Sequence, residues 1–96
     1  MFVGIAHFDL FLLEQPNSLK GKRSVVRRLV DRIRSRLSVS VAEVSHQDLW
    51  QRAGLGVAVV SSDQKLAEKL LDDVARLILT EGTVEIVDQQ VEVSSW

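Results

Sequence analysis

The chain has 96 residues, of which 46% are hydrophobic and 26% are charged, with one proline and no cysteine. This globular composition predicts one folded domain with a single core over residues 1–96, and the lack of cysteine excludes disulfides, thiolate zinc sites and iron–sulfur clusters. The formal net charge of −1 excludes a uniformly basic protein.

The first segment is predicted to be a strand that ends near Glu14. It begins without basic residues, is interrupted by His7 and Asp9, and is too short to span a bilayer, so it fits neither a signal peptide nor a membrane helix. A cytoplasmic protein without a membrane partner is therefore expected. The alternation typical of a strand places one set of side chains on a buried face: Ala6, Phe8, Leu10 and Leu12.

A helix is predicted to begin near Leu19, with the Ser18 hydroxyl as its N-terminal cap. Residues 20–36 contain eight basic residues and one acid, a net charge of +7, which leaves −8 on the rest of the chain. An anionic partner is therefore expected to meet one face of the molecule. The opposite, apolar face of the helix consists of Val26, Leu29, Val30, Ile33 and Leu37.

Two strands and a second helix follow. Residues 38–45 and 55–60 are rich in valine and too close together for a crossover helix, so they predict an antiparallel hairpin with a long tip and a register change near Glu43. Ser61 and Gln64 match a capping box for a helix that ends at Gly82. Residues 83–93 predict a last strand. The buried stripe of the second helix is predicted to be Leu66, Leu70, Val74, Leu77 and Ile78.

The order of these elements, βαββαβ, predicts the ferredoxin-like split βαβ fold of the α+β class. Right-handed crossovers place both helices on one face of a four-stranded antiparallel sheet. Proteins with this fold carry metals, bind RNA, sense amino acids or act as enzymes, so the fold alone specifies no function. The candidate sites have to do so.

The basic helix is the strongest indication of a partner. Guanidinium groups along one helix can neutralise successive RNA phosphates, whereas the alternative is a solvated face whose charges balance the acidic remainder. Base stacking on the sheet is not expected, because His7 and Phe11 are the only stacking candidates on the open face of the first strand. The expected RNA contacts are Lys20, Lys22, Arg23, Arg27, Arg28 and Arg34.

The tip of the hairpin is the second candidate site. His46 and Asp48 have the chemistry of an acid/base pair, and Trp50 with Arg52 suits a planar or anionic ligand or a protein partner. No activated nucleophile accompanies them, so no catalytic residue is assigned and the protein is expected not to be an enzyme. The alternative is structural: Leu49 and Trp50 close one end of the core while the polar side chains bond the loop backbone.

Neither a metal nor another cofactor is assigned. Gly54 and Gly56 lack the further glycine and the strand-to-helix setting of a phosphate loop. Two sets of side chains offer ligand atoms without the spacing of a compact metal motif: His7 with Asp9, and His46 with Glu43 and Asp48.

Residues 18–25, 41–53 and 55–61 resemble the YlxP-like family of small bacterial proteins. The stretch 41–53 is the most specific, because it holds His, Gln, Asp, Trp and Arg in order. The resemblance implies a ferredoxin-like domain of unknown function, and its gene neighbours in translation and ribosome maturation imply RNA or a ribosomal particle as the partner. It carries over no catalytic residue. Relatives often have an acidic residue in place of Gly21, which implies a looser helix start here.

Together these observations predict a non-catalytic accessory protein that binds RNA or a ribosomal precursor through its first helix. The alternative is a protein-interaction or small-ligand module that homodimerises through a sheet edge or its open face. Its expected contacts are His46, Asp48, Trp50 and Arg52.

Overall fold

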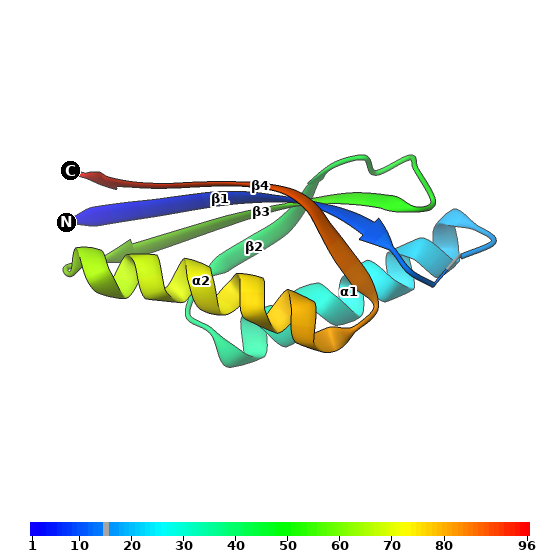
Figure 1. Cartoon of the computed structure of the whole chain (residues 1–96), viewed down its shortest axis with the longest axis horizontal. Helices are drawn as coiled ribbons and strands as arrows, with labels where there is room; N and C mark the ends of the chain where they lie inside the picture. The colour runs from blue at the N-terminus through cyan, green and yellow to red at the C-terminus, as the bar shows by residue number, and fades with distance from the viewer. Residues whose placement is uncertain (15) are drawn as a thin grey trace.

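The computed structural model describes residues 1–14 and 16–96. This part of the chain contains four strands and two helices. The strands form one antiparallel sheet in the order β2-β3-β1-β4, and both helices lie on the same face of it (Figure 1). The expected ferredoxin-like split βαβ fold is therefore confirmed. The elements are β1 (Phe2–Leu12), α1 (Leu19–Arg36), β2 (Ser40–Ser45), β3 (Arg52–Ser61), α2 (Gln64–Glu81) and β4 (Val84–Ser95).

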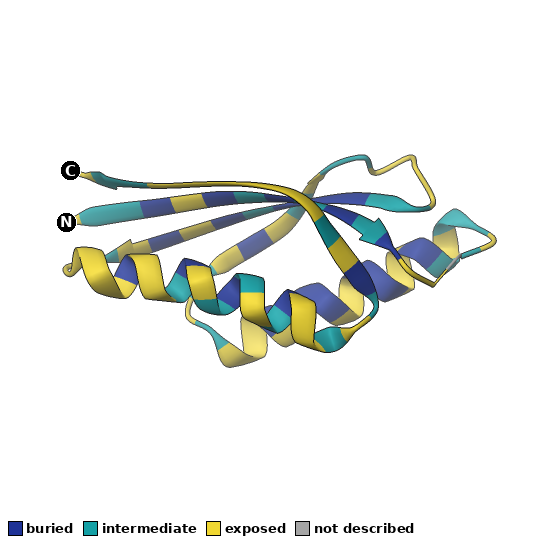
Figure 2. Ribbon diagram, in the orientation of Figure 1, coloured by how far each residue is buried: buried dark blue, intermediate teal, exposed yellow. Residues whose placement is uncertain are grey.

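The core lies between the sheet and the two helices (Figure 2). Along β1 the predicted alternation is confirmed, since Ala6, Phe8, Leu10 and Leu12 are buried while His7, Asp9 and Phe11 are partly exposed on the opposite face. Side chains of paired antiparallel residues share a face. The helix-free face, which we call the open face, therefore also carries the β3 partners of these residues: Arg52, Gly54 and Gly56.

Helix α1 begins and packs as its sequence predicts. The Ser18 hydroxyl accepts a hydrogen bond from the backbone N–H of Gly21 at 3.0 Å, and Leu37 caps the other end. The predicted apolar stripe is buried at Val26, Leu29, Val30 and Ile33, while Leu37 is partly buried against the core.

Helix α2 differs from the prediction at its start and in its buried face. Its N-cap is Asp63, whose carboxylate accepts from the N–H of Lys65, so the predicted capping box of Ser61 and Gln64 is wrong. Gly82 ends the helix in the left-handed region, as expected. The face against the sheet is Ala67, Leu71, Val74 and Ile78, and Leu66 is 46% exposed.

The physical reason is a close approach of α2 to β1. A Cβ on Gly4 would lie 2.9 Å from Leu71 Cδ1, so α2 fits closely against β1 because Gly4 has no side chain. Val74 and Ile78 of the predicted stripe stay buried, while Leu70 and Leu77 lie partly buried at the margin of the buried face. Leucines at the margin of a buried face keep part of their surface exposed.

The strands are longer or shorter than expected at their ends. β1 ends at Leu12, and β3 begins at Arg52 because its residues pair with Asp9 and Phe11 across the sheet. The antiparallel hairpin of β2 and β3 is confirmed, with its register shift between Glu43 and Ser45. Neither helix in the described part of the chain combines the length and the apolar character needed to cross a lipid bilayer.

Candidate nucleic-acid interface

One side of α1 carries an exposed line of basic side chains. Lys20, Arg23, Arg27 and Arg34 are all exposed, and spacings of three, four and seven residues place them on the same side of a helix. At a rise of 1.5 Å per residue, the line from residue 20 to residue 34 is about 21 Å long. We call these four residues the basic row.

Arg34 has a second attachment, because its guanidinium group donates a hydrogen bond to the carbonyl oxygen of Val41 at 2.7 Å. A guanidinium group has five N–H donors, so this bond leaves others for a phosphate. The contact joins the end of α1 to β2 and fixes one end of the basic row relative to the sheet.

Lys22 departs from its expected role. Its side chain is fully buried, and its ammonium group pairs with Glu43 at 2.6 Å and donates to the carbonyl oxygens of His46 and Gln47 at 2.9 and 3.3 Å. It is therefore not available to RNA, and we remove it from the expected contacts. The reason is its helical position, next to the exposed Arg23 but on the side of α1 that faces the hairpin.

Arg28 is exposed but lies on the other side of α1 from the basic row, one turn before Arg32. Arg32 forms an ion pair with Glu81 at the end of α2. This side of α1 therefore faces the second helix and its acidic residues. The expected contacts on one side of α1 thus reduce to the basic row, and Arg28 is exposed apart from it.

The structure brings together only part of the hairpin-tip set. Asp48 is exposed, and its carboxylate makes no hydrogen bond among the described residues. The tip is instead closed by the bond from the N–H of Leu49 to the carbonyl oxygen of His46. The predicted bonding of the loop backbone by Asp48 is therefore wrong.

The expected core role of Trp50 and Leu49 is also wrong. Trp50 is 50% exposed and Leu49 is 49% exposed, so neither closes the core, whose end is filled by Leu10, Leu12 and Ala53. A large apolar side chain on a loop tip can be placed outward without cost to the fold when the strands already bury the core. Sequence alone does not distinguish the two placements.

A polar cluster that the sequence analysis did not assemble lies on the open face. The Asp9 carboxylate accepts from the Arg52 guanidinium at 2.6 Å, and His46 Nε2 lies 3.5 Å from its other oxygen. The hydrogen bond from Arg52 lowers the pKa of Asp9. Pairing of Asp9 with Gly54 in the β1–β3 register brings these residues together. The period-two alternation of β1 predicts that Asp9 lies on the open face, but it does not predict the register in which β1 pairs with β3.

His7 and Ser45 complete the open-face cluster. Their side chains meet at 3.1 Å, between His7 Nε2 and Ser45 Oγ. Gly54 makes the contact possible, because a Cβ at this position would lie 1.7 Å from Ser45 Oγ and 3.0 Å from His7 Nε2. His46 adopts the left-handed region with φ of 59°, which directs the chain from β2 into the tip.

This arrangement does not form the acid/base pair that the sequence allowed. His46 faces Asp9 and not Asp48, and among the described residues no carboxylate pairs with His7 beside its contact with Ser45. Within residues 1–14 and 16–96 no group of three histidine, cysteine or acidic residues is placed to hold a metal ion. The cluster is best described as an ion-paired polar surface.

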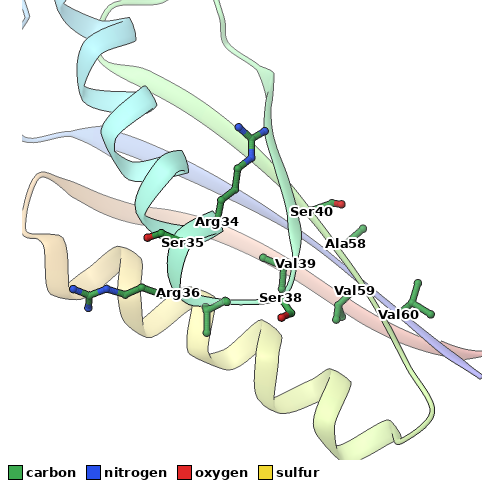
Figure 3. Close-up of a pocket in the computed structure, with 10 residues that line it drawn as sticks. Arg34, Ser35, Arg36, Ser38, Val39, Ser40, Ala58, Val59 and Val60 are labelled. Atoms are coloured by element: carbon green, nitrogen blue, oxygen red, sulfur yellow. The ribbon is translucent and has the colours of Figure 1, made fainter.

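Two hollows lie near the ends of α1. A hollow of about 520 Å³ lies at the end of α1 (Figure 3). There the side chains of Arg34 and Arg36 point in different directions, so their charges do not converge. A second hollow, of about 530 Å³, lies beside the start of α1 and is lined by Pro16, Asn17, Leu49, Trp50, Gln51 and Arg52.

Nearly the whole of this domain is similar to a known protein family. The sequence model of the family described as "Protein of unknown function (DUF503)" matches residues 3–91. The chain belongs to this family. A relative of this DUF503 chain, the uncharacterized protein YlxP of Bacillus subtilis (strain 168), is 37% identical over 76 residues, which are 79% of this chain and 82% of the relative. The resemblance found in the sequence is thus confirmed.

Among similar solved structures, one superposes well enough to support the fold of the DUF503 chain, and it supports nothing further. A putative chlorite dismutase superposes with a TM-score of 0.50 at 12% identity, over 99% of this chain and 45% of that one. The DUF503 chain thus spans less than half of that protein. The cofactor-independent oxygenase SnoaB from Streptomyces nogalater, in a mutant form, gives a TM-score of 0.44 at 8% identity, over 99% and 92% of the two chains.

Proposed function

We propose that this DUF503 protein is a non-catalytic accessory protein that binds structured RNA, such as a ribosomal precursor, through the basic row of α1. The observation that carries the proposal is the separation of the helix's cations by role. Lys22 is buried in an ion pair and Arg32 pairs with Glu81, whereas the basic row has no carboxylate partner among the described residues.

The size of the row sets the expected strength of salt dependence. If its four cations each meet one phosphate, log K falls with log salt at a slope of about −3 to −3.5. A fourfold rise in salt then weakens binding about 50- to 150-fold. A smaller slope means that fewer cations are used, and a larger one means that other surfaces contribute.

The test compares two variants that lose the same charge. In the first, Lys20, Arg23 and Arg27 are changed to Gln, and Arg34 is kept because of its bond to Val41. In the second, Lys65, Lys69 and Arg76 on α2 are changed to Gln. Both sets are exposed, so both changes are expected to leave the fold intact and to lower the net charge equally.

Binding to a fluorescent RNA stem-loop is measured for both variants over a salt series. The basic-row variant is expected to lose about 2 to 2.7 units of salt slope, since each of the three removed cations contributes about 0.7 to 0.9. The α2 variant is expected to keep the slope of the parent. Equal behaviour of the two variants, or no change in either, would show that α1 is not the contact.

The non-catalytic part of the proposal rests on the cluster at the hairpin. The histidine of the expected acid/base pair faces Asp9, which is held by Arg52, and an acid committed to an ion pair is a poor proton-transfer group. A screen of hydrolase and transferase substrates tests this. A turnover that is lost in both His46→Ala and Asp9→Asn, with the fold retained, contradicts it.

A second candidate function, homodimerisation through the open face, is favoured by the apolar side chains exposed there. Ile5, Val44 and Val60 are each at least half exposed. Four strands of about ten residues present roughly 600 Å², close to the roughly 800 Å² per partner of stable interfaces. Ile5→Lys is expected to lower the mass measured by light scattering, whereas Leu79→Lys on α2 is not. A monomeric parent at high concentration contradicts this candidate.

A further inference from the structure

The exposed indole of Trp50 is unexplained by packing. A half-exposed tryptophan beside a half-exposed leucine forms an apolar patch at the tip of the hairpin. Such patches on a soluble domain mark contact sites more often than chance placements. Trp50 lies next to the start of α1, because the hollow that it lines is closed on the other side by Pro16 and Asn17, just before the Ser18 cap.

The hollow beside Trp50 has the chemistry of a nucleotide site. Its volume of about 530 Å³ falls within the roughly 300–1,000 Å³ of ligand sites. Its polar lining, among the described residues, consists of two amides and a guanidinium group that is paired with Asp9: Asn17, Gln51 and Arg52. Amides can both donate to and accept from base edges. The indole of Trp50 offers an aromatic plane, the kind of group on which unpaired bases stack.

The hollow is held in shape by contacts on three sides. Lys22 binds the carbonyl oxygens of His46 and Gln47 at the tip. The N–H of Leu12 bonds the carbonyl oxygen of Gln51 at 2.8 Å, and Asp9 holds Arg52. A surface already fixed in its binding geometry loses little conformational entropy when a ligand binds.

We propose that this hollow receives one unpaired base of the bound RNA, stacked on Trp50, while the basic row holds the phosphates next to it. This inference rests on the proposed function and adds the class of RNA, one with an unpaired nucleotide beside a helix. The first cations of the row, Lys20 and Arg23, follow the hollow directly along α1. Charge complementarity therefore favours a nucleotide over an apolar peptide without acidic residues.

The test uses two RNAs with equal numbers of phosphates, a stem-loop and a fully paired duplex. Trp50→Leu keeps an apolar side chain and removes the aromatic plane, and Trp50→Phe keeps a smaller plane. The matched control is Trp96→Leu, which removes the other tryptophan, 80% exposed at the chain end. The basic-row variant is measured in parallel on both RNAs.

Trp50→Leu is expected to weaken stem-loop binding about tenfold and to leave duplex binding unchanged. Trp50→Phe is expected to retain most of the affinity, and Trp96→Leu all of it. In a Trp96→Phe background, the stem-loop is expected to quench the fluorescence of Trp50, because a stacked base contacts the indole. Circular dichroism of each variant checks the fold.

The outcomes separate the two proposals. If the basic-row variant loses both RNAs while Trp50→Leu loses neither, the base-stacking inference fails and the proposed function stands. If Trp50→Leu weakens both RNAs equally, or if RNA leaves the emission of Trp50 unchanged, the base-stacking inference also fails. If the basic-row variant keeps its affinity for both RNAs, the proposed function itself fails.

Discussion

The ammonium group of Lys22 lies 2.6 Å from Glu43 Oε2, with the lysine side chain fully buried and the glutamate side chain 18% exposed. Because the same ammonium group also binds the carbonyl oxygens of His46 and Gln47, one side chain of α1 holds the end of β2 and the hairpin tip. The ion pair therefore positions the surface on which Trp50 is displayed.

Removing one partner of this pair is expected to cost more than removing both. Glu43→Ala leaves a buried ammonium group without its carboxylate and should lower the free energy of unfolding by about 3 kcal/mol. The double variant Lys22→Met, Glu43→Leu should recover much of this loss, because no buried charge remains. Urea unfolding of the single and double variants measures the coupling. The exposed pair of Lys69 and Asp73 is the control, and Lys69→Met should change stability by less than about 0.5 kcal/mol.

The ion pair of Asp9 and Arg52 gives a definite pH dependence. The hydrogen bond from Arg52 holds the pKa of Asp9 below its ordinary value of 3.8. A depressed folded-state pKa contributes stability above the unfolded-state value and loses it as pH falls through the folded-state value. The parent should therefore exceed Asp9→Asn in free energy of unfolding by the largest amount near neutral pH, and this difference should decrease below pH 3.8. Thermal unfolding of both proteins from acid to neutral pH measures this difference. In an Arg52→Gln background, the difference should change less with pH.

The same substitution at two glycines is expected to act with opposite sign. A Cβ on Gly21 meets its nearest atoms at 3.4 and 3.5 Å, ordinary contact distances, so Gly21→Ala should stabilise α1 by about 0.5–1 kcal/mol. A Cβ on Gly54 falls 1.7 Å from Ser45 Oγ, so Gly54→Ala should destabilise by about 1–3 kcal/mol. Calorimetry of both variants decides it. Two changes of the same sign contradict the packing described on the open face.

Truncation of Trp50 is expected to cost little stability. Because its side chain is half exposed, Trp50→Ala should lower the free energy of unfolding by about 1 kcal/mol, since only part of its surface is removed from water. Phe8, which is fully buried in β1, provides the comparison, and Phe8→Ala should cost about 3–5 kcal/mol. A loss at Trp50 as large as the loss at Phe8 would mean that the indole belongs to the core.

Local patterns were sufficient for the order of elements and for most of the buried faces. Four predicted features agree with the structure: the period-two alternation of β1, the apolar stripe of α1, the start of α1 at Ser18 and the end of α2 at Gly82. Each depends only on neighbours within a few residues. The start of α2 was predicted wrongly, and its buried face was predicted only in part: Val74 and Ile78 are buried as expected, whereas Leu66 is exposed. The exact face depends on how closely the helix approaches Gly4 and not only on its own spacing.

The candidate site shows the same division between local and long-range causes. The charge of α1 and the presence of Trp50 and Arg52 are properties of the sequence, but their roles depend on contacts between residues far apart in the chain. Lys22 pairs with Glu43, twenty-one positions away, and Arg52 pairs with Asp9, forty-three positions away.

The sequence by itself determined the strand and helix order, the charge dipole and the family, because these follow from composition, periodicity and motif. Only the tertiary structure decided which cation of α1 is buried, which carboxylate faces His46 and on which side Trp50 lies. The physical reason is that burial and ion pairing depend on strand register and helix approach. A shift of one residue in either would exchange a buried side chain for an exposed one.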